Sequence, residues 1–182
     1  MKKPQADFDY LSELLEEFFA RRPLKSAFKV IADYEISGWE VWFQVEFARF
    51  LAEHDSEPEW GREWALEYDY RREKSRQFFR PDFTIRKKHW ALERYVALEI
   101  KQHQQPGNCI SNMIADLAKV AKIRKSELDV RSFWALGLFP TDSDQCMNKL
   151  IEEKLEAGGL AYHEARTRTG RISGTPFSYA LF

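Results

Sequence analysis

Residues 132–139 form an almost unbroken apolar run, Ser-Phe-Trp-Ala-Leu-Gly-Leu-Phe, which Pro140 ends. A strand with one face in water alternates apolar and polar side chains, so a continuous run needs cover on both faces. No apolar run in the chain approaches the roughly 20 residues that cross a bilayer. The run therefore predicts a central strand of a sheet that has helices on both sides.

Amphipathic segments that would provide this cover lie before and after the run. Apolar side chains recur at helical spacing in residues 5–20, 37–54, 109–128 and 143–157, which predicts four helices. Ser37 and Glu40 have the spacing of a capping box at the start of the second helix. Gly158-Gly159 is expected to end the fourth.

Strands are predicted at residues 63–70, 78–85 and 90–102, with short edge strands at 160–166 and 177–182. In the third strand, Val96, Leu98 and Ile100 share one face, and Ala97, Glu99 and Lys101 share the other. Three adjacent strands, a crossover helix and a buried strand imply an α/β fold with a mixed central sheet. We expect residues 1–182 to form a single domain, with an extra helix at the N-terminus.

Asp82 and Glu99 lie on two strands that are expected to pair as neighbours. Opposite residues on paired strands are about 5 Å apart, so these two carboxylates would form an oxygen site suited to Mg²⁺. Lys101 leaves the same face as Glu99 because it is two residues further along the strand. An ammonium beside a metal ion can hold the attacking water or offset charge that develops on a phosphate.

Pro81-Asp82 followed by Glu99-Ile100-Lys101 resembles the motif of the PD-(D/E)xK nuclease superfamily. The common core of that family, the restriction-endonuclease-like core, runs helix, three strands, helix, strand, and residues 37–139 are predicted in that order. The resemblance covers a little over half of the chain. It implies that Asp82 and Glu99 bind Mg²⁺ or Mn²⁺ and that Lys101 is the catalytic lysine. It also implies that Glu46, on the first core helix, is a further metal ligand or organises water at the metal.

One part of the sequence departs from a branch of that superfamily. The RecB-like branch carries Gln-x-x-x-Tyr on the helix after the third strand, where this chain has Asn112-Met113-Ile114-Ala115-Asp116. That branch is therefore not supported. Asn112 and Asp116 are interpreted as ordinary polar residues of a helix, and the alternative is that they face the site.

The function that follows from the resemblance is a Mg²⁺-dependent nuclease, in which water activated by the metal hydrolyses phosphodiester bonds, of DNA rather than RNA. Acidic residues dominate the first 70 positions and basic residues dominate the rest, so a polyanion would meet the second part. The candidate contacts to nucleic acid are Lys119, Lys122, Arg80 and His103. For each of them a solvated or structural role is the alternative.

A catalytically silent binding protein on the same fold, such as an immunity, anti-defence or regulatory factor with a protein partner, is the alternative function. A homodimer is a further expectation by analogy, because cutting both strands of a duplex benefits from paired sites. Cys109 and Cys146 fit no disulfide framework or zinc spacing, and no signal peptide is evident at the N-terminus. These features predict a cytoplasmic protein that does not enter a membrane.

Overall fold

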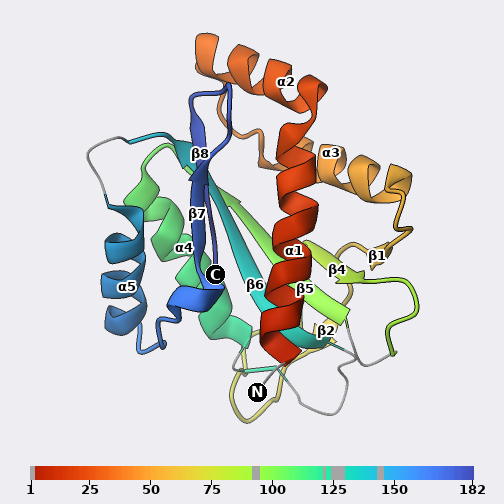
Figure 1. Ribbon diagram of the computed structural model, residues 1–182. Coiled ribbons are helices and arrows are strands. Elements are labelled where there is room, and N and C mark those ends of the chain that lie inside the picture. Colours follow the sequence, from red (N-terminus) through yellow and green to blue (C-terminus); the bar gives the residue numbers. More distant parts are fainter. Residues whose placement is uncertain (1–2, 92–94, 121, 124–129, 143–145) are drawn as a thin grey trace.

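A mixed six-stranded sheet with helices on both faces forms the centre of the computed structural model, which gives the chain an α/β architecture (Figure 1). The structure describes residues 1–182 except 1–2, 92–94, 121, 124–129 and 143–145. Its helices are α1 (Lys3–Ala20), α2 (Arg22–Asp33), α3 (Glu40–Glu53), α4 (Pro106–Val120), α5 (Met147–Ala157) and the 3-10 helix η3 (Glu164–Arg166). Its strands are β1 (Glu59–Gly61), β2 (Leu66–Glu67), β3 (Phe78–Phe79), β4 (Phe83–Arg86), β5 (Tyr95–Gln102), β6 (Val130–Pro140), β7 (Arg168–Arg171) and β8 (Phe177–Leu181).

The apolar run lies in β6, and the expectation that this strand is covered on both faces is confirmed. The strand order is β1-β4-β5-β6-β8-β7. β5 and β6 run parallel, joined by α4, and the other neighbouring pairs run antiparallel. Leu136 and Leu138 face one buried cluster, whereas Ala135 and Phe139 face a second.

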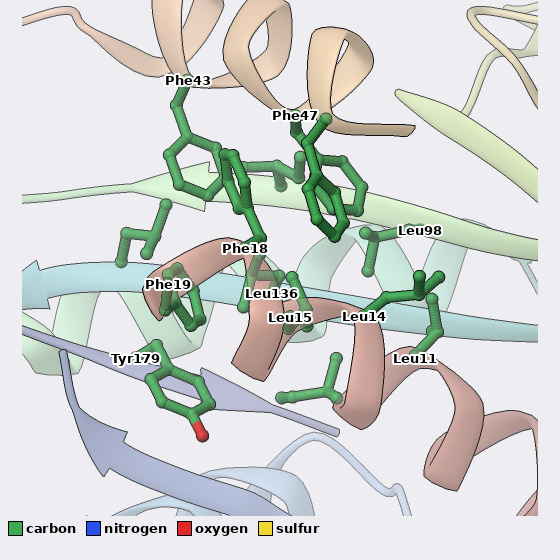
Figure 2. Close-up of a cluster of buried hydrophobic side chains, with 14 of the residues drawn as sticks. Leu11, Leu14, Leu15, Phe18, Phe19, Phe43, Phe47, Leu98, Leu136 and Tyr179 are labelled. Carbon is green, nitrogen blue, oxygen red and sulfur yellow. The ribbon is translucent and has the colours of Figure 1, made fainter. Parts of the chain in front are cut away.

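Aromatic side chains fill the first cluster, between the sheet and helices α1 and α3 (Figure 2). Phe18 of α1 lies at the centre, with its ring centroid 5.4 Å from that of Phe43 and 5.1 Å from that of Phe47. Phe47 in turn packs edge-on against Phe83 of β4. Figure 2 shows Leu11, Leu14 and Leu15 along the same side of α1, so the predicted amphipathic helix at 5–20 is confirmed.

The second cluster lies between the other face of the sheet and helices α4 and α5. Here α4 approaches the sheet closely at Gly137. A Cβ atom at this position would lie 2.4 Å from the sulfur of Met113 and 3.0 Å from that of Cys109, so any side chain here would force these side chains to move. The absence of a side chain at Gly137 therefore sets how near α4 lies to β5 and β6.

Several predicted boundaries are wrong. The first strand of the main sheet is β1, not residues 63–70. In that range only Leu66–Glu67 is a strand, and it pairs with β3 outside the main sheet. The predicted strand at 78–85 is broken between β3 and β4, because the backbone leaves one sheet and enters the other there. Residues 122–123 form a turn and a bridge to Tyr68, so the helix predicted to 128 ends at Val120. The rest of that prediction lies outside the described residues.

The chain ends also differ from expectation. β8 is not an edge strand, since it lies between β6 and β7, and residues 160–163 form no strand. Ser37 does not cap α3, because the helix begins after Trp39 with no side-chain cap. The Glu40 carboxylate instead accepts a hydrogen bond from Gln102 N. α2 was not predicted, although Pro23 at its first turn is a common helix start. None of the described helices has the length and apolar character to cross a membrane.

A buried ion pair ties the start of α1 to the start of β6. Asp7, which has no exposed surface, accepts a hydrogen bond from Arg131 Nε at 2.8 Å and one from Ser132 Oγ at 2.8 Å. A second Arg131 nitrogen, Nη2, donates to the other carboxylate oxygen. The Asp7 carboxylate is therefore removed from water and satisfied by Arg131 and Ser132, and the mostly buried Arg131 side chain has Asp7 as its counter-charge.

Replacing Asp7 with Ala is expected to lower the free energy of unfolding by about 3–5 kcal/mol, because the Arg131 guanidinium would remain buried without its counter-charge. Urea unfolding followed by circular dichroism measures this difference. Asp9→Ala is the matched control, since Asp9 lies two residues away on the exposed side of α1, and its effect should stay within about 0.5 kcal/mol. Equal effects of the two substitutions would contradict a structural role for the pair.

Candidate functional site

Asp82 and Glu99 come together where β4 begins beside β5. Phe83 pairs with Leu98 in the antiparallel register, so the preceding residue Asp82 lies next to Glu99 on the opposite sheet face. Asp82 Oδ2 accepts a hydrogen bond of 2.7 Å from Ile100 N, and Asp82 N donates to Glu99 Oε2 at 3.3 Å. These two contacts hold the two carboxylates side by side.

Lys101 lies between two carboxylates on the same face. Its Nζ is 3.0 Å from Glu99 Oε1 and 2.9 Å from Asp116 Oδ2. Asp116 is only 5% exposed and also pairs with Lys119, one turn further along α4. The interpretation of Asp116 as an ordinary polar residue of a helix is therefore wrong. Its spacing from Cys109 and Met113, seven and three residues, places it on the buried face of α4 and is the signal that identifies it.

The close packing at Gly137 explains why Asp116 reaches Lys101. Gly137 is the register partner of Lys101 across β5 and β6, and Met113 of α4 lies directly over it. Asp116 follows Met113 by about one helical turn. The small residue at position 137 thus lets Met113 pack against β6 one helical turn before Asp116.

Helix α3 packs on the sheet face opposite the one from which Glu99 and Lys101 project, as its contact between Phe47 and Phe83 indicates. Glu46 is half-buried on α3, and its negative charge helps to raise the pKa of Arg49 on the same helix. Glu40, at the start of α3, instead accepts a hydrogen bond of 2.9 Å from Gln102 N, and its negative charge raises the pKa of Asp82. The acid of α3 that reaches the site is thus Glu40.

Arg62 supplies a positive charge from the side of β1. Its Nη2 donates a 2.6 Å hydrogen bond to Gln44 Oε1, and its guanidinium lies 5.5 Å from the centre of the Phe83 ring. Its positive charge lowers the pKa of Asp82. The buried amide of Gln44 therefore contributes indirectly, by fixing the position of Arg62. The sequence pattern did not single out either residue.

The electrostatics of the site favour an added cation. Burial raises the pKa of Asp82 to about 6, with a further contribution from Glu40. Burial, followed by repulsion from Asp82, raises the pKa of Glu99 to about 7. Burial alone would lower the pKa of Lys101, but attraction to Glu99 and Asp116 outweighs it and raises that pKa above its ordinary value. Lys101 is therefore a fixed cation at neutral pH, and the two acids carry unfavourable negative charge.

The oxygen donors of the site fit Mg²⁺ or Mn²⁺. Asp82 Oδ1 receives no hydrogen bond from any described residue, so it is available beside the Glu99 carboxylate. No group of three or more His, Cys, Asp and Glu side chains with metal-binding spacing occurs in the part of the chain that the structure describes. Mg²⁺ is commonly held by one or two carboxylates and several waters, and the pair Asp82 and Glu99 matches that mode rather than a protein cage.

Three of the four candidate contacts to nucleic acid have partners within the protein other than the residues of the site, although the side chain of Arg80 stays exposed. Lys122 Nζ pairs with Glu73 at 2.8 Å, Arg80 Nη1 donates to Glu63 O, and His103 Nδ1 accepts from Gln105 N. Lys119 alone reaches the site, through Asp116. Cys109 lies beneath Lys101, and burial raises the pKa of its thiol to about 12, so it is not a nucleophile at neutral pH.

The chain matches no protein-family model, no curated protein and no solved structure at a significant level.

Replacing Asp82 with Asn is expected to stabilise the metal-free protein at pH 8 by on the order of 1–3 kcal/mol. The pKa of Asp82 is raised from 3.8 to about 6 on folding, so its ionised form destabilises the folded state above about pH 6. An asparagine oxygen can still accept the hydrogen bond from Ile100 N. The gain should shrink as the pH falls through 6 and vanish below about pH 4, where the carboxyl is protonated in both states.

Thermal unfolding in EDTA across this pH range measures the effect. Asp55→Asn, at an exposed position, is the control and should show no such pH-dependent gain. A loss of stability in Asp82→Asn at pH 8 would mean that the carboxylate is favourably compensated in the folded protein.

Proposed function

We propose that this chain is a Mg²⁺-dependent nuclease with a restriction-endonuclease-like core of the PD-(D/E)xK type. The observation that carries the proposal is the convergence of Asp82, Glu99 and Lys101 at one place on the sheet. The order of elements supports it as well: α3, then the antiparallel strands β1, β4 and β5, then α4, then β6 parallel to β5. This is the order that the family resemblance implies.

Each residue has a distinct task in the proposed reaction. Asp82 and Glu99 would hold the metal ion, which when bound supplies Lewis-acid polarisation of the scissile phosphate and makes water more acidic. Lys101 carries a permanent positive charge and would offset the negative charge that grows on the phosphate as the bond to the leaving oxygen breaks. Because its pKa lies above the ordinary value, Lys101 would not remove a proton itself.

Asp116 and Ile100 would keep these groups in place. The Asp116 carboxylate holds the Lys101 ammonium from the side of α4, and the Ile100 amide fixes one oxygen of Asp82. Positioning of this kind reduces the motion that must be frozen out when the transition state forms. Glu46 has no part in this arrangement, and Glu40 contributes through its charge and its hydrogen bond to the end of β5.

A catalytically silent binding protein is the second proposal. It is favoured by five exposed apolar side chains on and beside α2 and α3, which are Val30, Tyr34, Ile36, Val41 and Val45. Groups of exposed apolar residues often mark a surface for a protein partner. In that case the buried acids and Lys101 would form an internal charge cluster with no reaction to perform.

The nuclease proposal predicts that Lys101→Ala lowers the rate of Mg²⁺-dependent cleavage by about 100-fold or more, because the fixed cation beside the phosphate is lost. The measurement is cleavage of labelled single-stranded and double-stranded DNA and RNA. Lys29→Ala, on the exposed side of α2, should cleave like the wild type. Equal rates for wild type and Lys101→Ala would remove Lys101 from the mechanism, and absence of cleavage of all four substrates would favour the binding protein.

Metal binding can be tested without any activity. Excess Mn²⁺, at about 100 times its Kd, is expected to raise the Tm of the wild type by roughly 5–10 °C. Asp82→Asn should be more stable than the wild type in EDTA at pH 8, yet gain little from Mn²⁺, because it lacks one of the two ligands. An unchanged Mn²⁺ effect in Asp82→Asn would place the metal elsewhere.

A further inference from the structure

We infer that the segment from Leu66 to Arg80 forms a platform on which unpaired bases of a single-stranded nucleic acid stack, next to the site proposed above. This inference rests on the proposed function for the identity of the ligand. The segment leaves the main sheet after β1 and returns to it at β4, and in between it folds as the small antiparallel pair β2 and β3. Figure 1 shows β2 at the lower end of the molecule, towards which α4 runs.

One side of the segment is anchored in the protein. Leu66, Tyr68 and Phe79 are buried with Ile123, in a small cluster against Val120 at the end of α4 and Phe133 of β6. The amide of Asp69 donates a 2.9 Å hydrogen bond to Lys122 O, and Lys122 Nζ pairs with Glu73. The segment therefore has a defined position and is not a loose loop.

Two aromatic rings of the segment are exposed to solvent: Phe78 on the face of β3 opposite Phe79, and Tyr70 in the turn that follows β2. Tyr70 is 72% exposed and Phe78 is 40% exposed, and each has an arginine beside its ring: Arg71 at 5.7 Å from the centre of the Tyr70 ring and Arg80 at 5.9 Å from that of Phe78. Exposed aromatic side chains cost solubility, and two of them with cationic neighbours suit flat, electron-rich bases. A hollow of about 610 Å³ beside Tyr70 leaves room for a ligand.

The charge of the segment complements a phosphate backbone. Its basic side chains are Arg71, Arg72, Lys74, Arg76 and Arg80, and its acids are Glu67, Asp69 and Glu73. Hydrogen bonds from Lys122 and Ser75 lower the pKa of Glu73 to about 2, so this acid is already satisfied within the protein. Five basic and three acidic side chains give the whole segment a balance of +2, which attracts a polyanion.

The platform is connected to the site at both of its ends. Arg80 precedes Asp82 by two residues, and Val120, which packs against the buried side of the segment, follows Asp116 by about one turn of α4. A strand whose bases stack on Tyr70 and Phe78 would therefore pass its backbone near Asp82 and Glu99. Bases in a duplex already stack on each other and offer only their edges, so exposed rings favour an unpaired strand.

The test is fluorescence anisotropy with labelled oligonucleotides of about 12 nucleotides in EDTA, where no metal-dependent cleavage takes place. The probes are oligo(dT), oligo(U) and a blunt DNA duplex of the same length. We expect at least one single strand to bind about 10-fold or more tightly than the duplex. Tyr70→Ala and Phe78→Ala should each weaken that binding about 5- to 100-fold, which corresponds to the loss of one stacked base, and Tyr70→Trp should retain it.

Tyr34→Ala is the matched control, because Tyr34 is 76% exposed but lies beside α2, outside the segment. Unchanged circular dichroism and Tm would establish that the variants fold. Binding of the duplex as tight as that of the single strands, or unaltered binding by both alanine variants, would overturn the platform. Cleavage with no effect of Tyr70 or Phe78 would overturn it and leave the nuclease proposal intact, whereas single-strand binding without cleavage would overturn only the nuclease.

Discussion

The pairing register of β5 determines both the core and the candidate site. Val96, Leu98 and Ile100 pack into the aromatic cluster under α1 and α3, which requires Ala97, Glu99 and Lys101 to face α4. A register shift of one residue would bury Glu99 and Lys101 among phenylalanine rings, where the free-energy cost of removing their charges from water would not be offset by hydrogen bonds. The large apolar cluster therefore fixes the direction of the two charged side chains, and the register with β4 brings Asp82 beside them.

A second constraint acts on the electrostatics of that face. Asp82, Glu99 and Asp116 lie near the half-buried Lys101, Glu40 adds negative charge beside Asp82, and Arg62 and Lys119 contribute positive charge from the edges. Folding alone does not favour two adjacent carboxylates whose pKa values are raised by burial and by each other. Functional sites often contain such destabilising groups. Here a bound cation would replace the repulsion between Asp82 and Glu99 with attraction of both carboxylates to the cation. Asp7 and Arg131 form the contrasting case, a buried pair in which each charge is matched.

The spacing of apolar residues was sufficient to predict the helices and strands in which buried residues recur at a regular helical or strand period. The helix at α1, the doubly covered β6 and the two faces of β5 all follow from such periods, and so does the pairing of Asp82 with Glu99. Spacing places Asp116 on the buried face of α4, but the contact of Asp116 with Lys101 and the location of Glu40 were not predictable in this way. They depend on which sheet face each helix covers and on the close approach of α4 at Gly137. Residues 63–70 alternate like a strand of the main sheet, yet β1 has that place. Alternation of apolar and polar residues alone does not determine with which strand a segment pairs.

That misassigned segment has a physical reason for its strand-like pattern. Leu66, Tyr68 and Phe79 need apolar cover and are buried in one cluster, so these residues have the pattern of a core strand, although the chain turns at Tyr70, which is exposed. The main sheet is continuous without the segment, because β1 pairs directly with β4 through Gly61 and Thr84. The segment thus adds little to the central core, and its exposed rings and arginines are not explained by stability. A contribution to ligand binding accounts for residues that the fold itself does not require.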